Sequence, residues 1–325
     1  MEDAPRPKRR RTDASDDTPL LVRSDDYWFH DGNIILQVQF TQFRLTESLL
    51  AMHSSVFRDM FSVPLPSDEA TVEDCPVVVL RGDREEDWIL FLGVLYPKSY
   101  AGEAPTVKLL AAMLRLSKKY DFAVFRKDCL NRLKRQFPTT LKEFDKVSSD
   151  WTFIKYEESS YRDLVSLARE IGLHSILPAL YAGMLLKVDT YIEMILDQDG
   201  GFSATDRLAC LTGYTNLLQQ QLTTSFKWLN FERPHPVLPV ETCRQRHKCL
   251  AAVKVLLLDF SLQSRPRVRA IARWDKRWEA DLCVLCQKEA RKVFREGKEV
   301  CWDGLPEAFG LPEWDDLKAL DFDIE

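Results

Sequence analysis

The sequence predicts an α+β fold, in which a small mixed sheet with surrounding helices occupies the first half of the chain and an all-helical C-terminal domain the second half. Apolar and polar residues alternate over Ile34–Phe40, which is typical of a half-buried strand. Apolar residues at helical spacing follow soon after this alternation and return repeatedly. After Pro138 almost no two-residue period remains. With 325 residues, 45% of them hydrophobic, the chain is long enough to bury two separate cores.

The first half alternates between strand and helix patterns. A second short strand is predicted at Phe43–Leu45, after a turn. The side chains of Thr46 and Ser54 are of the kind that accept hydrogen bonds at helix N-termini, so a helix is expected after each. The β-branched run at Val77–Leu80 predicts a third strand. Further helices are expected at Glu85–Leu95, from Pro105 onward, and at Phe122–Phe137.

The second half shows helical patterns throughout. Gly172 and the three prolines within Glu232–Pro239 interrupt these patterns, because glycine and proline commonly end helices. The expected helices are Tyr161–Ile171, Ser175–Leu186, Asp206–Phe226, Gln245–Phe260, Trp274–Glu296 and Trp314–Leu320.

The first 26 residues have almost no apolar side chains before Leu20, so we expect this basic and acidic tail to be disordered. It contains a basic run, Lys8–Arg11, of the kind that acts as a nuclear import signal. The opening residues are acidic without an apolar core, which argues against a secretory signal, and no apolar stretch reaches the roughly 18 residues of a membrane span. A location in the nucleus or the cytoplasm, with the eight cysteines reduced, is therefore expected.

The segment Phe43–Phe61 carries the clearest family pattern, and it resembles the BTB/POZ domain. The matching positions are Phe43, Leu50, Ser54 and Phe57. Two positions depart from the family: Asn33 stands where an Asp is usual before the strand, and Thr46 stands where a His is usual.

Further blocks are similar to a large fungal, basidiomycete-type group of BTB proteins in which a helical region follows the BTB domain. These blocks are Leu114–Phe122, Phe137–Leu141, Leu164–Gly172 and Leu305–Trp314. The resemblance implies a BTB/POZ domain at residues 27–138 and a helical domain at residues 139–325, after the tail at residues 1–26.

The resemblance implies a protein–protein interaction module, an adaptor or scaffold, and not an enzyme. BTB domains pair with themselves or with other BTB domains, and they bind partners such as cullin scaffolds and corepressors. No long amphipathic helix precedes the first predicted strand, which argues against a strand-swapped homodimer. The sequence also lacks a dinucleotide fingerprint, a P-loop, a His-Glu-x-x-His motif and a Gly-x-Ser-x-Gly elbow, so no catalytic or cofactor-binding residue is predicted.

Four late cysteines have the residue type and spacing of a zinc site. Cys283 and Cys286 are separated by two residues, as in a zinc knuckle, and Cys243 with Cys249 would supply the second pair of the four tetrahedral ligands. This requires Cys243 to lie in a turn before its helix begins. His247 is the substitute ligand if Cys249 points away from the site.

A structural alternative exists for the same residues. Cys283 and Cys286 are three positions apart, so on the expected Trp274–Glu296 helix both would face the core of the domain without binding a metal. Small core residues are also expected at Cys75, Cys129 and Cys210.

Residues 241–298 form a basic segment, with 15 Lys and Arg against 7 Asp and Glu, although the whole chain has a net charge of −5. Arginines alternate there with Trp274 and Trp278, a composition found on nucleic-acid-binding surfaces. A nucleic-acid-associated regulator is therefore the alternative to the interaction module. No known DNA-binding motif is present, and a solvated face that complements the acidic Glu313–Glu325 tail accounts for the same charges.

Overall fold

A computed structural model describes residues 20–64, 71–97, 103–147, 151–197, 201–230, 236–263 and 265–322. The chain divides into two compact units, Met1–Pro97 and Lys98–Glu325. This boundary precedes the expected one at residue 138, because the helices between the two positions belong to the second unit. The basic run Lys8–Arg11 lies outside the described residues.

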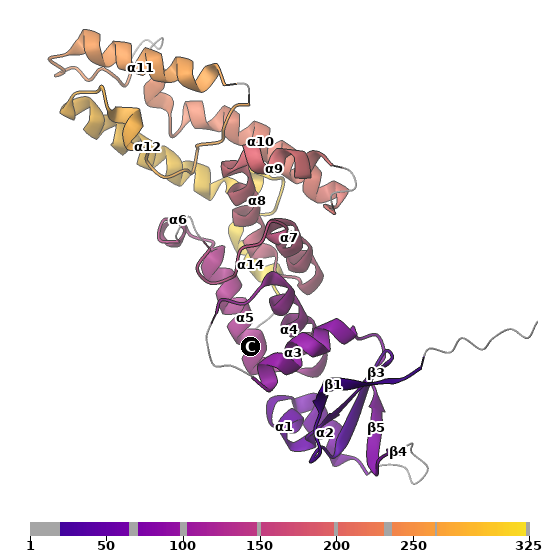
Figure 1. Cartoon of the computed structure of the whole chain (residues 1–325). Helices are drawn as coiled ribbons and strands as arrows, with labels where there is room; N and C mark the ends of the chain where they lie inside the picture. Colours follow the sequence, from indigo (N-terminus) through magenta and orange to yellow (C-terminus); the bar gives the residue numbers. More distant parts are fainter. Residues whose placement is uncertain are drawn as a thin grey trace, which may run out of the picture. The chain divides into compact units, whose positions relative to one another are not determined.

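The first unit is built on a five-stranded mixed sheet with the strand order β1-β3-β2-β5-β4 (Figure 1). The centre of the sheet is a hairpin of β2 (Ile34–Val38) and β3 (Thr41–Leu45), in which Leu36 lies opposite Phe43. β5 (Cys75–Val79) runs parallel to β2 and pairs on its other side with the short β4 (Thr71–Val72). The three strands predicted from the sequence are thus present, and the mixed α+β class is confirmed.

The first strand, β1 (Val22–Trp28), corrects the expectation that residues 1–26 are disordered. It runs parallel to β3, and backbone hydrogen bonds join Val22 N–H to Phe40 O (2.7 Å) and Phe29 N–H to Arg44 O (3.0 Å). Its side chains are mostly exposed and polar, apart from the buried Tyr27. Backbone pairing at the sheet edge stabilises this strand, so apolar patterning gave no sign of it.

Three helices complete the first unit: α1 (Glu47–His53), α2 (Ser55–Ser62) and α3 (Glu85–Leu95). The Ser54 hydroxyl accepts a hydrogen bond from the N–H of Phe57 at 3.0 Å and caps α2, as predicted. Thr46 occupies the N-cap position of α1, but its side chain makes no capping hydrogen bond there. Each helix contributes fully buried side chains to the core, among them Leu50, Phe57, Trp88 and Phe91.

In the described residues of the second unit all regular structure is helical. The α-helices are α4 (Val107–Tyr120), α5 (Ala123–Gln136), α6 (Leu141–Phe144), α7 (Ser160–Ile171), α8 (Leu177–Leu186), α9 (Val188–Leu196), α10 (Ala204–Thr223), α11 (Arg246–Ser261), α12 (Val284–Asp303), α13 (Leu305–Ala308) and α14 (Trp314–Leu320). Short 3₁₀ turns lie at η1 (His174–Ile176), η2 (Lys227–Leu229) and η3 (Lys276–Glu279). Among the described helices none has both the length and the apolarity to cross a membrane.

One helix expected in this unit is wrong. Instead of a continuous Trp274–Glu296 helix, the chain forms the η3 turn, then a second turn, and α12 begins only at Val284. The carboxylate of Asp275 accepts a hydrogen bond from the N–H of Arg277 and caps η3, while Cys283 is extended (φ −69°, ψ 160°). Helical spacing continues across this break, because both segments pack on the same core.

That core joins η2, α11 and α12, and Figure 1 shows α11 and α12 in the same part of the second unit. Its aromatic centre includes Phe226, which packs edge-on against Phe260, Trp278 and Phe294 with ring centroids 5.0–5.2 Å apart. Cys243, Cys249 and Cys286 are buried members of the same core, and Cys283 packs against it. The aromatic packing therefore places four thiols in one region.

Candidate metal centre

The four cysteines predicted as zinc ligands come together at one point. The Sγ atoms of Cys243, Cys249, Cys283 and Cys286 all lie within 4.8 Å of one another. Cys243 Sγ lies 3.7 Å from Cys249 Sγ and 3.6 Å from Cys283 Sγ. Zn–S bonds of about 2.3 Å at tetrahedral angles put sulfurs roughly 3.8 Å apart, so these spacings fit one zinc ion.

The first pair is positioned by the turn that precedes α11. The N–H of Cys243 donates to Val240 O at 2.9 Å, which closes a turn directly after Pro239. Cys249 lies in the first turns of α11, where its N–H donates to Gln245 O at 3.0 Å. As expected, Cys243 lies before the helix, and this change of direction brings two sulfurs six positions apart to the same side.

The second pair lies at the beginning of α12, where Cys283 is the N-cap residue and Cys286 is in the first turn. The backbone N–H of Cys283 donates to Cys249 Sγ at 3.3 Å, which ties the two halves together. Both α11 and α12 thus begin at the cluster. The N-terminus of a helix carries a partial positive charge and free N–H groups, and both stabilise thiolates.

The thiols differ in their affinity for protons. A hydrogen bond from the backbone N–H of Cys286 lowers the pKa of Cys283 to about 7, with further lowering by contacts to the other thiols. Burial raises the pKa of Cys249 and of Cys286. A divalent metal would therefore displace protons from the buried thiols on binding, as zinc does at all-cysteine sites.

His247 is not part of the cluster, because Cys249 points into it and no substitute ligand is needed. The residue is exposed on α11, whereas Cys249 is fully buried and supplies the fourth sulfur. The fifth late cysteine, Cys301, lies near the other end of α12 with its sulfur 3.0 Å from the Thr224 hydroxyl. The three isolated cysteines are buried as predicted, and burial raises the pKa of Cys129 and of Cys210 to about 12.

The structural alternative explains this arrangement less well than a metal. Core packing accounts for the burial of cysteines but gives no reason for four sulfurs from two chain segments to meet at one point. Cys283 is also only partly buried. The donor set, four thiolates, is the one that zinc takes in structural sites.

Comparisons with known proteins add no relative to this picture. No protein-family model matches the sequence, and a search of curated proteins finds no significant match.

Proposed function

We propose that the protein is a non-catalytic protein–protein interaction protein of the BTB/POZ type, an adaptor or scaffold whose helical unit is organised by one structural zinc ion. The observation that carries the zinc part is the convergence of the Cys243, Cys249, Cys283 and Cys286 sulfurs. Four protein ligands complete a tetrahedron and leave no coordination position for a substrate. Such a centre stabilises a fold and does no chemistry.

The BTB/POZ assignment is supported by the order of elements in the first unit. The β2-β3 hairpin is followed by the α1-α2 pair, then β5 and α3, which is the order of strands and helices that the sequence predicts for this half of the chain. The matched motif positions have the buried places that a structural motif requires: Phe43, Leu50 and Phe57 are fully buried and Ser54 is 1% exposed. Met52, 66% exposed on α1, offers an apolar side chain to a partner.

Zinc would join the beginning of α11 to the beginning of α12. The segment between the two cysteine pairs contains the long α11 and the irregular chain that leads to η3. Because a preformed site is absent from an unfolded chain, zinc binding would contribute directly to folding. This gives the helical unit a rigid scaffold on which to present a surface.

Two measurements on the purified full-length chain test the proposal. Metal analysis should find one zinc per chain. Size-exclusion light scattering, alone and with purified cullin amino-terminal domain or BTB-binding corepressor fragments, should show self-association or a stable complex. Met52→Glu should weaken that association at least tenfold, and Arg84→Glu, at an exposed position of the same unit, should leave it unchanged. A zinc-free, monomeric chain that binds none of these partners would refute the proposal.

A second candidate function is contact with nucleic acid through residues 241–298. It is favoured by four arginines, Arg267, Arg269, Arg273 and Arg277, along one groove. Two of them are already paired with carboxylates, Arg267 with Asp189 and Arg277 with Asp275. Phosphate contacts would make binding fall steeply with salt, so salt-independent retention of DNA or RNA would exclude this candidate.

A further inference from the structure

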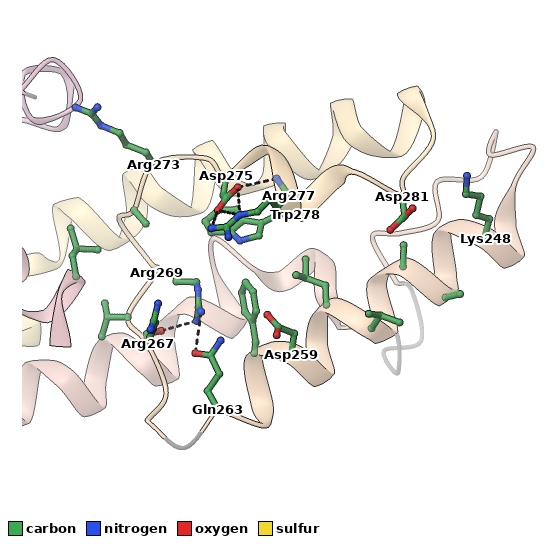
Figure 2. A pocket seen from close by; sticks show the side chains of 18 residues that line it. Lys248, Asp259, Gln263, Arg267, Arg269, Arg273, Asp275, Arg277, Trp278 and Asp281 are labelled. Atoms are coloured by element: carbon green, nitrogen blue, oxygen red, sulfur yellow. Dashed lines mark hydrogen bonds and ion pairs between the residues drawn. The ribbon is translucent and has the colours of Figure 1, made fainter. Parts of the chain in front are cut away.

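A groove of about 880 Å³ runs along α11 in the helical unit (Figure 2). Its floor is one stripe of α11 at spacings of three and four residues, which runs from Lys248 through Val255 and Leu256 to Phe260, and Gln263 continues it just after the helix ends. This spacing places the side chains of the stripe on one side of the helix. The middle of the stripe is apolar, and its ends are polar. From Lys248 to Phe260 the floor is therefore about 20 Å long.

The facing wall is the irregular segment before α12, and it is rich in cations. Four arginines, Arg267, Arg269, Arg273 and Arg277, line it together with Trp278, Asp275 and Asp281. Figure 2 shows Arg267 and Arg269 beside Gln263 at one end of the groove, and Lys248 with Asp281 at the other. Across the whole groove five cations face three carboxylates, so the cavity has a positive excess.

The wall is held in place by contacts to buried parts of the unit. The side chain of Gln221 on α10 accepts a hydrogen bond from Arg269 N–H (2.8 Å) and donates one to Arg267 O (3.4 Å). Farther along the wall, Trp278 packs against Phe226 with ring centroids 5.0 Å apart. The next residue, the buried Glu279, forms an ion pair with Arg291 on α12. The groove is therefore formed before a ligand arrives.

Among the described residues, the hydrogen-bond acceptors of two of these guanidinium groups are neutral oxygens. Arg269 stacks over the Phe260 ring at 4.2 Å and donates to Gln263 Oε1 and to Arg267 O. Its burial, followed by the neighbouring Arg267 charge, lowers its pKa, although the carboxylates of Asp259 and Asp189 act in the opposite direction. Arg273, on the exposed rim, donates to Val147 O. Acidic groups bound along this wall would give each of these arginines a charged acceptor.

We propose that this groove binds an amphipathic α-helix of a protein partner, with an apolar face toward α11 and acidic residues toward Arg269 and Arg273. The proposal rests on the proposed function as an interaction protein and names the chemistry of the partner. An apolar helical floor with charged flanks is the surface that helix-in-groove recognition uses. The length of the floor fits about three and a half turns of a partner helix.

The same groove suits a nucleic acid less well. Three carboxylates line it, Asp259, Asp275 and Asp281, and each would repel the regularly spaced phosphates of a strand. The apolar stripe through Val255 and Leu256 offers nothing to a sugar–phosphate backbone. An amphipathic helix can place its acidic side chains beside the arginines and its apolar side chains on the apolar stripe, so it complements both parts of the groove.

The test begins with a displayed library of helical 16-residue peptides, panned on the zinc-loaded full-length protein. We expect enrichment of sequences with Leu or Phe at helical i, i+3 and i+7 spacing and with Asp or Glu beside that face. The consensus peptide, labelled with fluorescein, is then titrated by anisotropy. Val255→Glu on the floor and Arg273→Glu on the rim should each weaken the binding of this peptide at least tenfold. Arg295→Glu, an exposed charge reversal on α12 outside the groove, should change it less than twofold.

Several outcomes would overturn the inference. These are no enrichment, enriched sequences without acidic residues, or equal affinity for the parent and for Arg273→Glu. Displacement of the peptide by single-stranded DNA that itself binds the groove more tightly, and loses affinity in Arg273→Glu, would identify a nucleic-acid surface instead. Zinc content and the Met52-dependent association are measured on the same protein. If they persist while the peptide fails to bind, the groove proposal alone is wrong.

Discussion

At the scale of single residues, Gly297 shows how closely α12 approaches the turn after α10. A Cβ atom at this position would lie 2.2 Å from the backbone nitrogen of Ser225 and 2.3 Å from the carbonyl carbon of Thr224. Backbone atoms cannot move aside as a flexible side-chain end would. Two chain segments therefore contact each other here without any intervening side chain.

We expect Gly297→Ala to lower the free energy of unfolding by about 1–3 kcal/mol, the range typical of overpacking. Chemical denaturation of the full-length chain measures this change. Gly304→Ala is the matched control, because its added Cβ would be 3.6 Å from the nearest atom, Val300 O, an ordinary contact. Equal stability of the two variants would show that α12 and the 224–225 turn are less closely packed than described.

At the scale of elements, η3 is fixed by a partly buried ion pair. The carboxylate of Glu279 accepts hydrogen bonds from the Arg291 guanidinium, and this lowers the pKa of Glu279 in the folded protein. Because the folded pKa is below the unfolded value of about 4.3, the stabilisation is complete above that pH and is lost as the pH falls through the folded pKa. The pair holds the wall of the groove against α12.

Replacement of the Glu279 carboxylate should therefore lower the stability of the protein by an amount that depends on pH. We expect Glu279→Gln to lower the melting temperature at pH 7, and the difference from the parent protein to shrink as the pH is lowered from 5 to 3. Thermal unfolding at several pH values measures it. Asp281→Asn, which removes an exposed carboxylate two residues later, should show no such narrowing. A pH-independent difference for Glu279→Gln would contradict the assigned ion pair.

Strong periodicity is what made elements predictable. The Glu85–Leu95 helix and the Ile34 strand were found at or near their observed limits, because each has a regular apolar face. β1 could not be found, since backbone pairing with β3 forms it and its side chains are mostly polar. The break before α12 was not predicted, because Trp274 and Trp278 lie outside α12 and yet have the four-residue spacing of a helix. Asp275, which caps η3, was the available signal.

The metal centre was predictable as a set of residues but not as a geometry. The Cys283–Cys286 spacing named one pair, and the four sulfurs do meet. The choice between Cys249 and His247 depended on where α11 begins, which the flanking sequence does not specify. Helical periodicity in α4 likewise does not say which core the helix joins, and the structure places α4 in the second unit.

At the scale of the whole molecule, the chain divides into two compact units, and the four cysteines of the candidate zinc centre all belong to the second. Removal of zinc should therefore destabilise the helical unit and leave the β-sheet unit unchanged. We expect a strong chelator, or Cys286→Ser, to lower the melting temperature of one transition by about 10 °C, since each kcal/mol corresponds to roughly 2–4 °C for a unit of this size.

Calorimetry of the full-length chain with and without chelator measures this effect. The control is Cys301→Ser, which changes another buried cysteine of α12 beside the Thr224 hydroxyl and should keep the metal and the transition. A chelator that lowers both transitions equally, or neither, would contradict a zinc centre confined to the helical unit.

The separation of the two cysteine pairs has a kinetic consequence. Cys249 and Cys283 are 34 positions apart, and their direct contact exists only when the starts of α11 and α12 have met. In an unfolded chain each pair would offer two sulfurs, and closing the long loop between them costs entropy. Tight capture of the ion should therefore be the last step of folding, after the helices dock. Its slow release, in turn, would set how long each folded molecule survives.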